Sequence, residues 1–198
     1  MFINTTAFKR LIKDTYNTTG LTVGATEEEY FFEGGTWEIR VNKENLPNKE
    51  KAAVIELAGE LPGPGEAFKA LKKCANQYLI DNPAWDIRKS AEEARLKLDV
   101  TRAVYETSYR TLRVLQSVKD NTCITIDETF MNLISEQAMD REKESIVIGP
   151  VADGNSVYWR NNIMTLAAGV VLPVEGTPLA EYLQLLANVE LEKKKISY

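Results

Sequence analysis

Residue types that commonly carry catalysis are scarce in this sequence. Its 198 residues include no histidine, which excludes serine–histidine and cysteine–histidine nucleophiles, imidazole-bound zinc and imidazole general bases. The two cysteines, Cys74 and Cys123, are too far apart to form a C-x-x-C pair, and we interpret them as buried free thiols of a reducing cytosol. No G-x-G-x-x-G or G-x-x-x-x-G-K-[ST] pattern is present to bind phosphates. We therefore expect no cofactor.

Carboxylates acting with a divalent metal are the chemistry that remains. Glu192 and Lys194 form an E-x-K pair of the kind that some nucleases use, but no second carboxylate on an adjoining strand is evident. The three consecutive carboxylates at 27–29 cannot all point to one side of a strand, and Asp127 fits a helix cap better than a metal ligand. We therefore expect no metal site and no enzyme, and keep a divergent metal-dependent nuclease as a third hypothesis.

Clusters of cations are the other candidate functional groups, although the formal net charge is −5. They lie off the apolar faces of two expected helices, one near the start of the chain and one that Thr107 or Ser108 would cap. The candidate DNA-binding residues are Lys9, Arg10 and Lys13 on the first helix and Arg110, Arg113 and Lys119 on the second. Two helices that each bury one face and expose cations on the other would hold a phosphate backbone electrostatically. The alternative is that these cations only keep exposed helices soluble.

The first half of the chain predicts helices separated by short strands. A helix capped by Thr5 or Thr6 extends to about residue 16 and buries Phe8 and Leu11. Strand candidates follow at residues 21–25, 29–32 and 36–41, and a second helix at about 49–60. Prolines and glycines at 61–65 break the chain. Residues 66–80 fit either a helix or a pair of strands, and a helix that begins at Asn82 would reach about residue 96.

The second half predicts strands and helices in irregular order. Strands are expected at residues 96–100, 122–126, 146–148, 156–160 and 164–174. Helices are expected from Thr107 or Ser108 to about 119, from Asp127 to about 138, and from Pro178 to about 191. The first of these helices would bury Leu112, Leu115 and Val118. Because no regular strand–helix–strand alternation appears, the pattern predicts an α+β fold with mixed or antiparallel sheets.

A partial internal duplication suggests how these elements are grouped. The segment Phe8–Leu11 resembles Tyr109–Leu112, and each follows a threonine or serine that would cap a helix. The expected strands that come next, Leu21–Val23 and Ile124–Ile126, then occupy corresponding positions in the two segments. This repeat predicts two loosely similar units, one formed by residues 1–61 with 66–99 and the other by residues 100–198.

The order of helix and strands in the two halves resembles a pair of DNA sliding-clamp domains, the processivity factors of DNA polymerases. Val157–Arg160, followed by an apolar strand that closes in Val170–Val174, is similar to the last strands of bacterial clamps. Ile3–Phe8 resembles the strand-to-helix opening of such domains. The resemblance implies a clamp-like fold in which helices that carry basic residues face double-stranded DNA.

The sequence leaves the partner open. No apolar run approaches the roughly 18 residues of a membrane span, and the N-terminus lacks the order of a secretion signal, so we expect a cytoplasmic protein without membrane contact. Our first hypothesis is a non-enzymatic protein of a phage or other mobile element, with clamp-like domains that associate with duplex DNA or with DNA-processing machinery. The alternative is an anti-defence inhibitor of the anti-CRISPR type, which binds a nucleic-acid-guided nuclease or another host or phage protein. Either is compatible with an oligomer.

The scarcity of catalytic groups generates a first prediction. We expect the purified protein not to nick supercoiled plasmid DNA in the presence of Mg²⁺ or Mn²⁺, because no set of carboxylates is spaced to hold the ion. Gel electrophoresis of the plasmid measures this. Metal-dependent nicking that a single Asp or Glu substitution abolishes would contradict the prediction.

Overall fold

The computed structural model describes residues 1–79 and 86–194, and an antiparallel sheet is the framework of this part of the chain. Eleven strands follow the order β5-β4-β1-β2-β3-β11-β10-β9-β6-β7-β8. Their bounds are Leu21–Ala25 (β1), Glu29–Gly34 (β2), Trp37–Asn42 (β3), Ala67–Ala70 (β4), Gln77–Tyr78 (β5), Leu96–Glu106 (β6), Thr111–Ser117 (β7), Cys123–Asp127 (β8), Ile148–Ala152 (β9), Ser156–Arg160 (β10) and Met164–Gly169 (β11). Each neighbouring pair of these strands is antiparallel.

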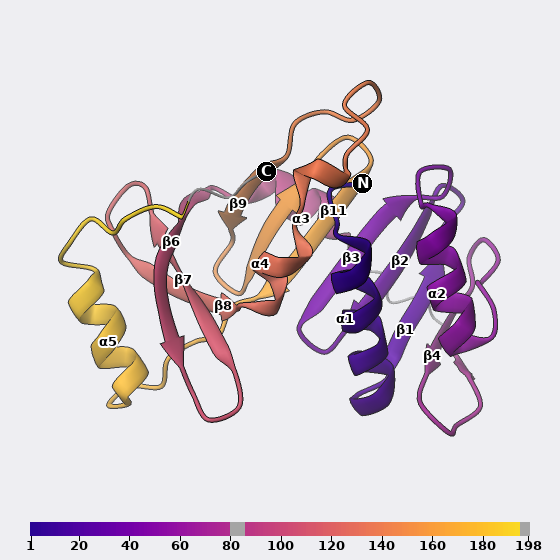
Figure 1. Cartoon of the computed structure of the whole chain (residues 1–198), viewed down its shortest axis with the longest axis horizontal. Coiled ribbons are helices and arrows are strands. Elements are labelled where there is room, and N and C mark those ends of the chain that lie inside the picture. Colours follow the sequence, from indigo (N-terminus) through magenta and orange to yellow (C-terminus); the bar gives the residue numbers. More distant parts are fainter. Residues whose placement is uncertain (80–85, 195–198) are drawn as a thin grey trace.

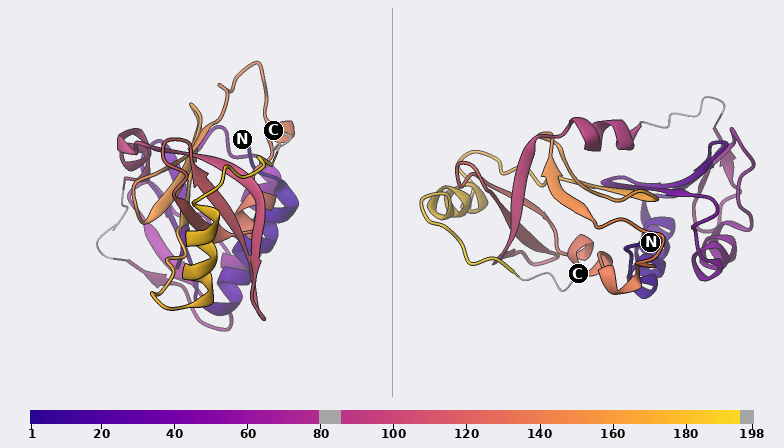
Figure 2. Two further views of the ribbon diagram at one scale, coloured as in Figure 1. Left: turned by 90° about the vertical axis from the view of Figure 1, so that its left-hand side faces the viewer. Right: turned by 90° about the horizontal axis from the view of Figure 1, so that it is seen from above.

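Helices lie on both faces of the sheet. The described helices are α1 (Thr5–Thr18), α2 (Asn48–Ala58), α3 (Ile87–Glu93), α4 (Thr129–Leu133) and α5 (Pro178–Leu186). Seen from above, α1 and α4 lie on one side of the sheet and α3 on the other, and α5 lies at the far end of the molecule (Figures 1 and 2). The central strands are covered on both faces, since Leu166 belongs to the main core whereas its neighbour Ala167 packs with Ile87 and Ala91 of α3. This combination of helices with a large antiparallel sheet confirms the α+β prediction.

Two three-stranded meanders meet at the centre of the sheet. Strands β1-β2-β3 and β9-β10-β11 each pair in order, and β3 pairs with β11. Each meander follows a helix in the chain, since α1 precedes β1 and α4 precedes β9, and these two helices contact each other. The predicted match of Phe8–Leu11 with Tyr109–Leu112 as two helix starts is wrong, because residues 111–117 form β7. The division at residues 99 and 100 stays a prediction, and β6 runs through it.

The helix predicted after Thr107 or Ser108 is wrong, because residues 111–117 form strand β7. The Thr107 hydroxyl does not cap a helix but closes the β6–β7 hairpin, where its Oγ1 accepts from the Arg110 amide at 3.1 Å and donates to the Arg110 carbonyl at 2.8 Å. Hydroxyl-to-backbone bonds of this kind serve turns as well as helix caps. Of the three apolar residues expected inside, Leu112 and Leu115 are buried, whereas Val118 is 58% exposed beyond the end of the strand.

Other predicted elements are confirmed with shifted ends. Strand β1 matches its predicted bounds, and α1 is present, although its cap is Asn4, whose side chain accepts from the Ala7 amide. The ambiguous segment 66–80 contains the strand pair β4 and β5, and the strand expected at 146–148 lies at Ile148–Ala152. Part of the helix predicted from Asn82 lies outside the described residues, and α3 begins at Ile87 behind the cap Asp86.

The long apolar strand predicted at 164–174 ends at Gly169. Beyond it, the Val171 amide donates to the Thr125 carbonyl at 2.7 Å, which covers part of the β8 edge. Leu172 and Val174 are then exposed at 62% and 71%. The expected burial of the thiols also fails for Cys74, which is exposed.

The helix predicted from Asp127 is shorter than expected, and so is the last one. The first is interrupted after α4 and continues only as a 3₁₀ turn at Glu136–Ala138, and α5 ends at Leu186. Within residues 1–79 and 86–194, no helix has the length and apolar character that crossing a membrane requires.

The burial of β7 generates a second prediction. Leu112 is 1% exposed, so Leu112→Ala should lower the free energy of unfolding by roughly 2–5 kcal/mol through lost burial and a cavity. Val118→Ala, at an exposed residue just beyond the end of β7, is the matched control and should change it by no more than about 0.5 kcal/mol. Urea unfolding followed by circular dichroism measures both. Equal effects of the two variants would show that β7 is not packed as described.

Candidate functional site

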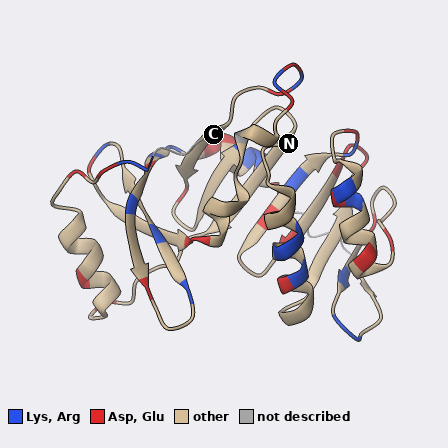
Figure 3. Ribbon diagram, in the orientation of Figure 1, with Lys and Arg blue, Asp and Glu red and all other residues tan. Residues whose placement is uncertain are grey.

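Helix α1 presents the first predicted set of cations to solvent. Its buried residues, Phe8, Leu11, Ile12 and Thr15, fix it against the sheet. Lys9, Arg10 and Lys13 are all exposed, and Figure 3 shows the basic residues in the middle of this helix. The guanidinium of Arg10 lies 3.7 Å from Asp14, but both side chains are mostly exposed, at 81% and 68%. Such a surface pair contributes little stability, so the three cations remain available to a ligand.

The second predicted set is dispersed, because its segment is a strand and not a helix. Arg110 precedes β7 and Lys119 follows it, so these two residues lie at opposite ends of the strand. Arg113 is 7% exposed and holds Glu128 through two hydrogen bonds, from Nε at 2.6 Å and from Nη2 at 2.5 Å. It also donates to the Thr101 carbonyl at 3.0 Å. The placement of these three residues on one exposed helical face is therefore wrong.

The partner of Arg113, Glu128, is part of a partly buried ionic cluster. Burial would raise the pKa of Glu128, but the hydrogen bonds and charge of Arg113, together with the charge of Lys194, outweigh it and lower that pKa. The Lys194 ammonium lies 3.3 Å from the Glu128 carboxylate. Removing one member of a buried ion pair leaves the other uncompensated. Arg113 and Lys194 are thus engaged in ion pairs within the protein.

One cavity joins cations from both predicted sets. It has a volume of about 620 Å³ and lies between the first half of α1, the β6–β7 hairpin and the β8–α4 junction; we call it the α1–hairpin cavity. The residues that line it are Asn4, Thr6, Ala7, Arg10, Tyr109, Arg110, Thr111, Asp127, Glu128, Thr129 and Asn132. Its two carboxylates are engaged in the fold, since Glu128 binds Arg113 and Asp127 accepts from the Thr129 amide at 2.9 Å. Arg10 and Arg110 are its cationic groups.

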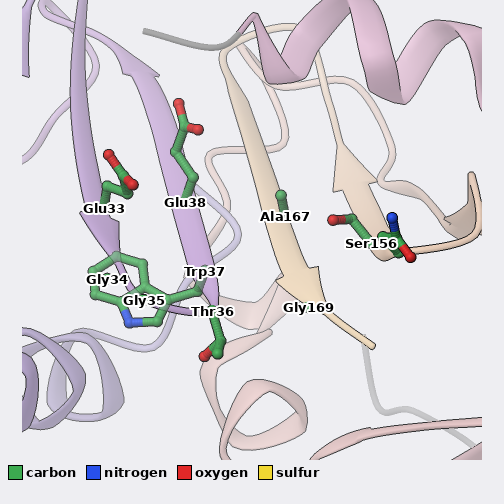
Figure 4. Close-up of a pocket in the computed structure, with 10 residues that line it drawn as sticks. Glu33, Gly34, Gly35, Thr36, Trp37, Glu38, Ser156, Ala167 and Gly169 are labelled. Atoms are coloured by element: carbon green, nitrogen blue, oxygen red, sulfur yellow. The ribbon is translucent and has the colours of Figure 1, made fainter. Parts of the chain in front are cut away.

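A second cavity, of about 270 Å³, has carboxylates in its wall. Figure 4 shows Glu33 and Glu38 on the neighbouring strands β2 and β3, where they are direct cross-strand partners. Burial raises the pKa of Glu38 to about 7, against a smaller lowering by the hydrogen bond from Arg40 Nε at 3.0 Å. Burial also raises the pKa of Glu33, and the charge of Lys69 opposes the rise. Among the described residues, no three carboxylates or thiols are grouped to hold a metal ion.

Tyr109 and Glu38 do not stand out in the sequence. The sequence pattern predicts a helix at Tyr109, and only the Thr107–Arg110 turn shows that it lies at a hairpin tip. Glu38 alternates with the buried Trp37 and Ile39, which usually marks a solvent-facing side of a strand. The polar alternation was the available signal, but nothing in it indicates that this face of β3 is covered.

Comparison with known proteins gives structural neighbours and no sequence relative. No family model matches the chain, and no curated protein sequence matches it. Its structure is similar to the β subunit of DNA polymerase from Streptococcus pyogenes, at 11% identity and a TM-score of 0.35, over 90% of this chain and 66% of that chain. It is also similar to the DNA polymerase III β chain from Streptococcus pneumoniae TIGR4, at 12% identity and a TM-score of 0.35, over 91% of this chain and 66% of that chain.

These neighbours are of the sliding-clamp class that the sequence resembles. The chain spans 66% of the length of each. A likeness with a TM-score of 0.35 assigns it neither to their family nor to their activity.

The raised pKa of Glu38 generates a third prediction. In the folded protein the carboxyl group of Glu38 has a pKa of about 7, against an ordinary value of 4.5. Between these two pH values the folded state therefore binds more protons than the unfolded chain. Stability contributed by this group is therefore present below pH 4.5 and is lost as the pH rises through 7. Glu38→Gln cannot ionise, so its unfolding free energy relative to wild type should improve by roughly 3 kcal/mol from pH 4.5 to pH 8.

Urea titrations of wild type and variant at several pH values measure this difference. Every other carboxylate is present in both proteins, so the comparison reports on Glu38 together with its coupling to the neighbouring Glu33. A difference that stays constant across the pH range would contradict the raised pKa.

Proposed function

We propose that this chain is a non-catalytic binding protein that holds the phosphate backbone of duplex DNA on the exposed side of α1. The observation that supports this most directly is the arrangement of α1, whose packed apolar side fixes the helix while Lys9, Arg10 and Lys13 face solvent. Phosphate contacts by lysine and arginine carry no sequence information. Binding is therefore expected to be independent of sequence.

The net charge favours contact through a local basic surface. The whole chain carries a net charge of −5, so a polyanion is held only where cations gather. Arg110, which lines the α1–hairpin cavity together with Arg10, extends the basic surface beyond the helix. Four cations are thus proposed to contact phosphates: Lys9, Arg10, Lys13 and Arg110. Arg113 is left out because its guanidinium is engaged with Glu128.

A second candidate function, binding to a protein, has its own support at the far end of the molecule. Apolar side chains on α5 and in the flanking segments are exposed: Leu172 at 62%, Val174 at 71%, Leu185 at 70% and Val189 at 52%. Exposed apolar residues that gather in one region are typical of protein contact sites. In this case the cations of α1 would serve solubility.

Salt dependence generates the fourth prediction and separates the two candidates. Four neutralised phosphates give a log–log slope of affinity against salt of about −3.6, because each contact releases most of one condensed counterion. Changing Lys9, Arg10 and Lys13 to Ala should flatten the slope to about −1. Fluorescence anisotropy with labelled duplex DNA at several salt concentrations measures it.

The matched control removes the same amount of charge elsewhere. Lys89 of α3, Lys97 of β6 and Arg95 between these two elements are exposed, so changing all three to Ala should leave the slope close to that of wild type. No binding near 50 mM salt would reject the DNA proposal in favour of a protein partner. Equal flattening by both triple variants would reject the role of α1.

A further inference from the structure

An aromatic ring stands exposed at the tip of the β6–β7 hairpin. Tyr109 is 77% exposed, yet its turn is held firmly, because the Thr107 amide donates to the Arg110 carbonyl at 2.9 Å and the Arg110 amide donates to Thr107 Oγ1 at 3.1 Å. The backbone that carries the ring is therefore held in place before any ligand binds. A turn that is already ordered loses little conformational freedom when its side chain contacts a ligand.

Arg110 supplies a cation beside this ring. Its guanidinium carbon lies 5.4 Å from the Tyr109 ring centroid, within the range of a cation–π contact. Its Nε is buried without a hydrogen-bond partner among the residues that the structure describes. No carboxylate of those residues forms an ion pair with it. A partly desolvated guanidinium in this state favours an incoming anion.

The α1–hairpin cavity places a second cation and polar groups around the same space. Arg10 enters its wall from α1, and Thr6 and Asn132 add side chains that donate and accept hydrogen bonds. Its volume of about 620 Å³ lies within the roughly 300–1,000 Å³ typical of small-molecule sites. The cavity wall also contains the carboxylates of Asp127 and Glu128, of which Glu128 is paired with Arg113 and Asp127 accepts from the Thr129 amide. An aromatic ring, two arginines and hydrogen-bonding side chains in one cavity suit a nucleotide whose phosphate lies on the arginine side.

We propose that this cavity binds one unpaired nucleotide of single-stranded DNA, whose base stacks on the Tyr109 ring and whose phosphate lies between Arg10 and Arg110. Bases inside a duplex are stacked on their neighbours and offer no free face, so the site requires a strand end, a gap or an opened segment. The inference deepens the proposed function, because it adds a base contact at the edge of the basic surface of α1.

The test compares two labelled single strands of 12 nucleotides, one of thymidine and one with abasic sites throughout. Both carry the same phosphates, so any difference in affinity reports on the bases. Wild type should bind the thymidine strand about tenfold more tightly, the size of one stacked base. Tyr109→Ala should abolish this preference, and Tyr109→Phe should keep it. Tyr78→Ala, which changes another exposed tyrosine at 60% exposure on β5, is the matched control and should also keep it.

The outcomes separate this inference from the duplex proposal. Equal binding of both strands by wild type, or loss of the preference in Tyr78→Ala as well, overturns the nucleotide site. A preference that depends on Tyr109 supports the base contact even if duplex binding shows no role for the cations of α1, and only the phosphate contact of Arg10 is then rejected. If neither the duplex nor either of the two single strands binds near 50 mM salt, both the nucleotide site and the duplex proposal are overturned.

Discussion

The antiparallel pairing of β3 with β11 is the constraint on which the rest of the structure depends. It joins residues 37–41 to residues 164–168, two segments separated by more than half of the chain. Closing so long a loop costs conformational entropy, and the burial of both faces of these strands offsets that cost. Ile39 and Leu166 contribute to the main core, while Ala167 packs under α3. A polar substitution on the core face of β3 or β11 would weaken the packing that holds the two meanders together.

This pairing also determines where the basic surface lies. With the two meanders joined, their helices α1 and α4 lie next to each other, and the Asn4 amide donates to the Leu133 carbonyl at 2.8 Å while the Ser135 amide donates to the Phe2 carbonyl at 2.8 Å. The segment before α4 is β8, the hairpin partner of β7. The tip of the β6–β7 hairpin therefore comes to the first half of α1. Arg10 and Arg110, one hundred residues apart in sequence, line one cavity for this reason.

The sequence predicted local elements well where a single periodicity was present. The helix at α1 has apolar residues only at helical spacing, and β1 is a short apolar run bounded by glycine, so both were located. The segment 109–119 was misassigned because Leu112 and Leu115 are three residues apart, a spacing that also occurs in a strand covered on both faces. Leu115 belongs to the main core, and Leu112 is buried on the opposite side of β7. Tertiary packing, which the sequence pattern does not contain, decided between the two.

The same ambiguity explains why the candidate site was only half predicted. On α1, cations between apolar residues are exposed, because a surface helix buries one stripe and leaves the rest to water. On a strand with two covered faces, a cation between apolar residues must enter the interior, as Arg113 does against Glu128 and Arg40 does between Glu29 and Glu38. Burying such a charge is tolerated only with a partner, so each of these arginines comes with a carboxylate. Counting basic residues along the chain therefore overestimates the surface that a polyanion can use, and the type of element on which each cation lies determines whether it is available.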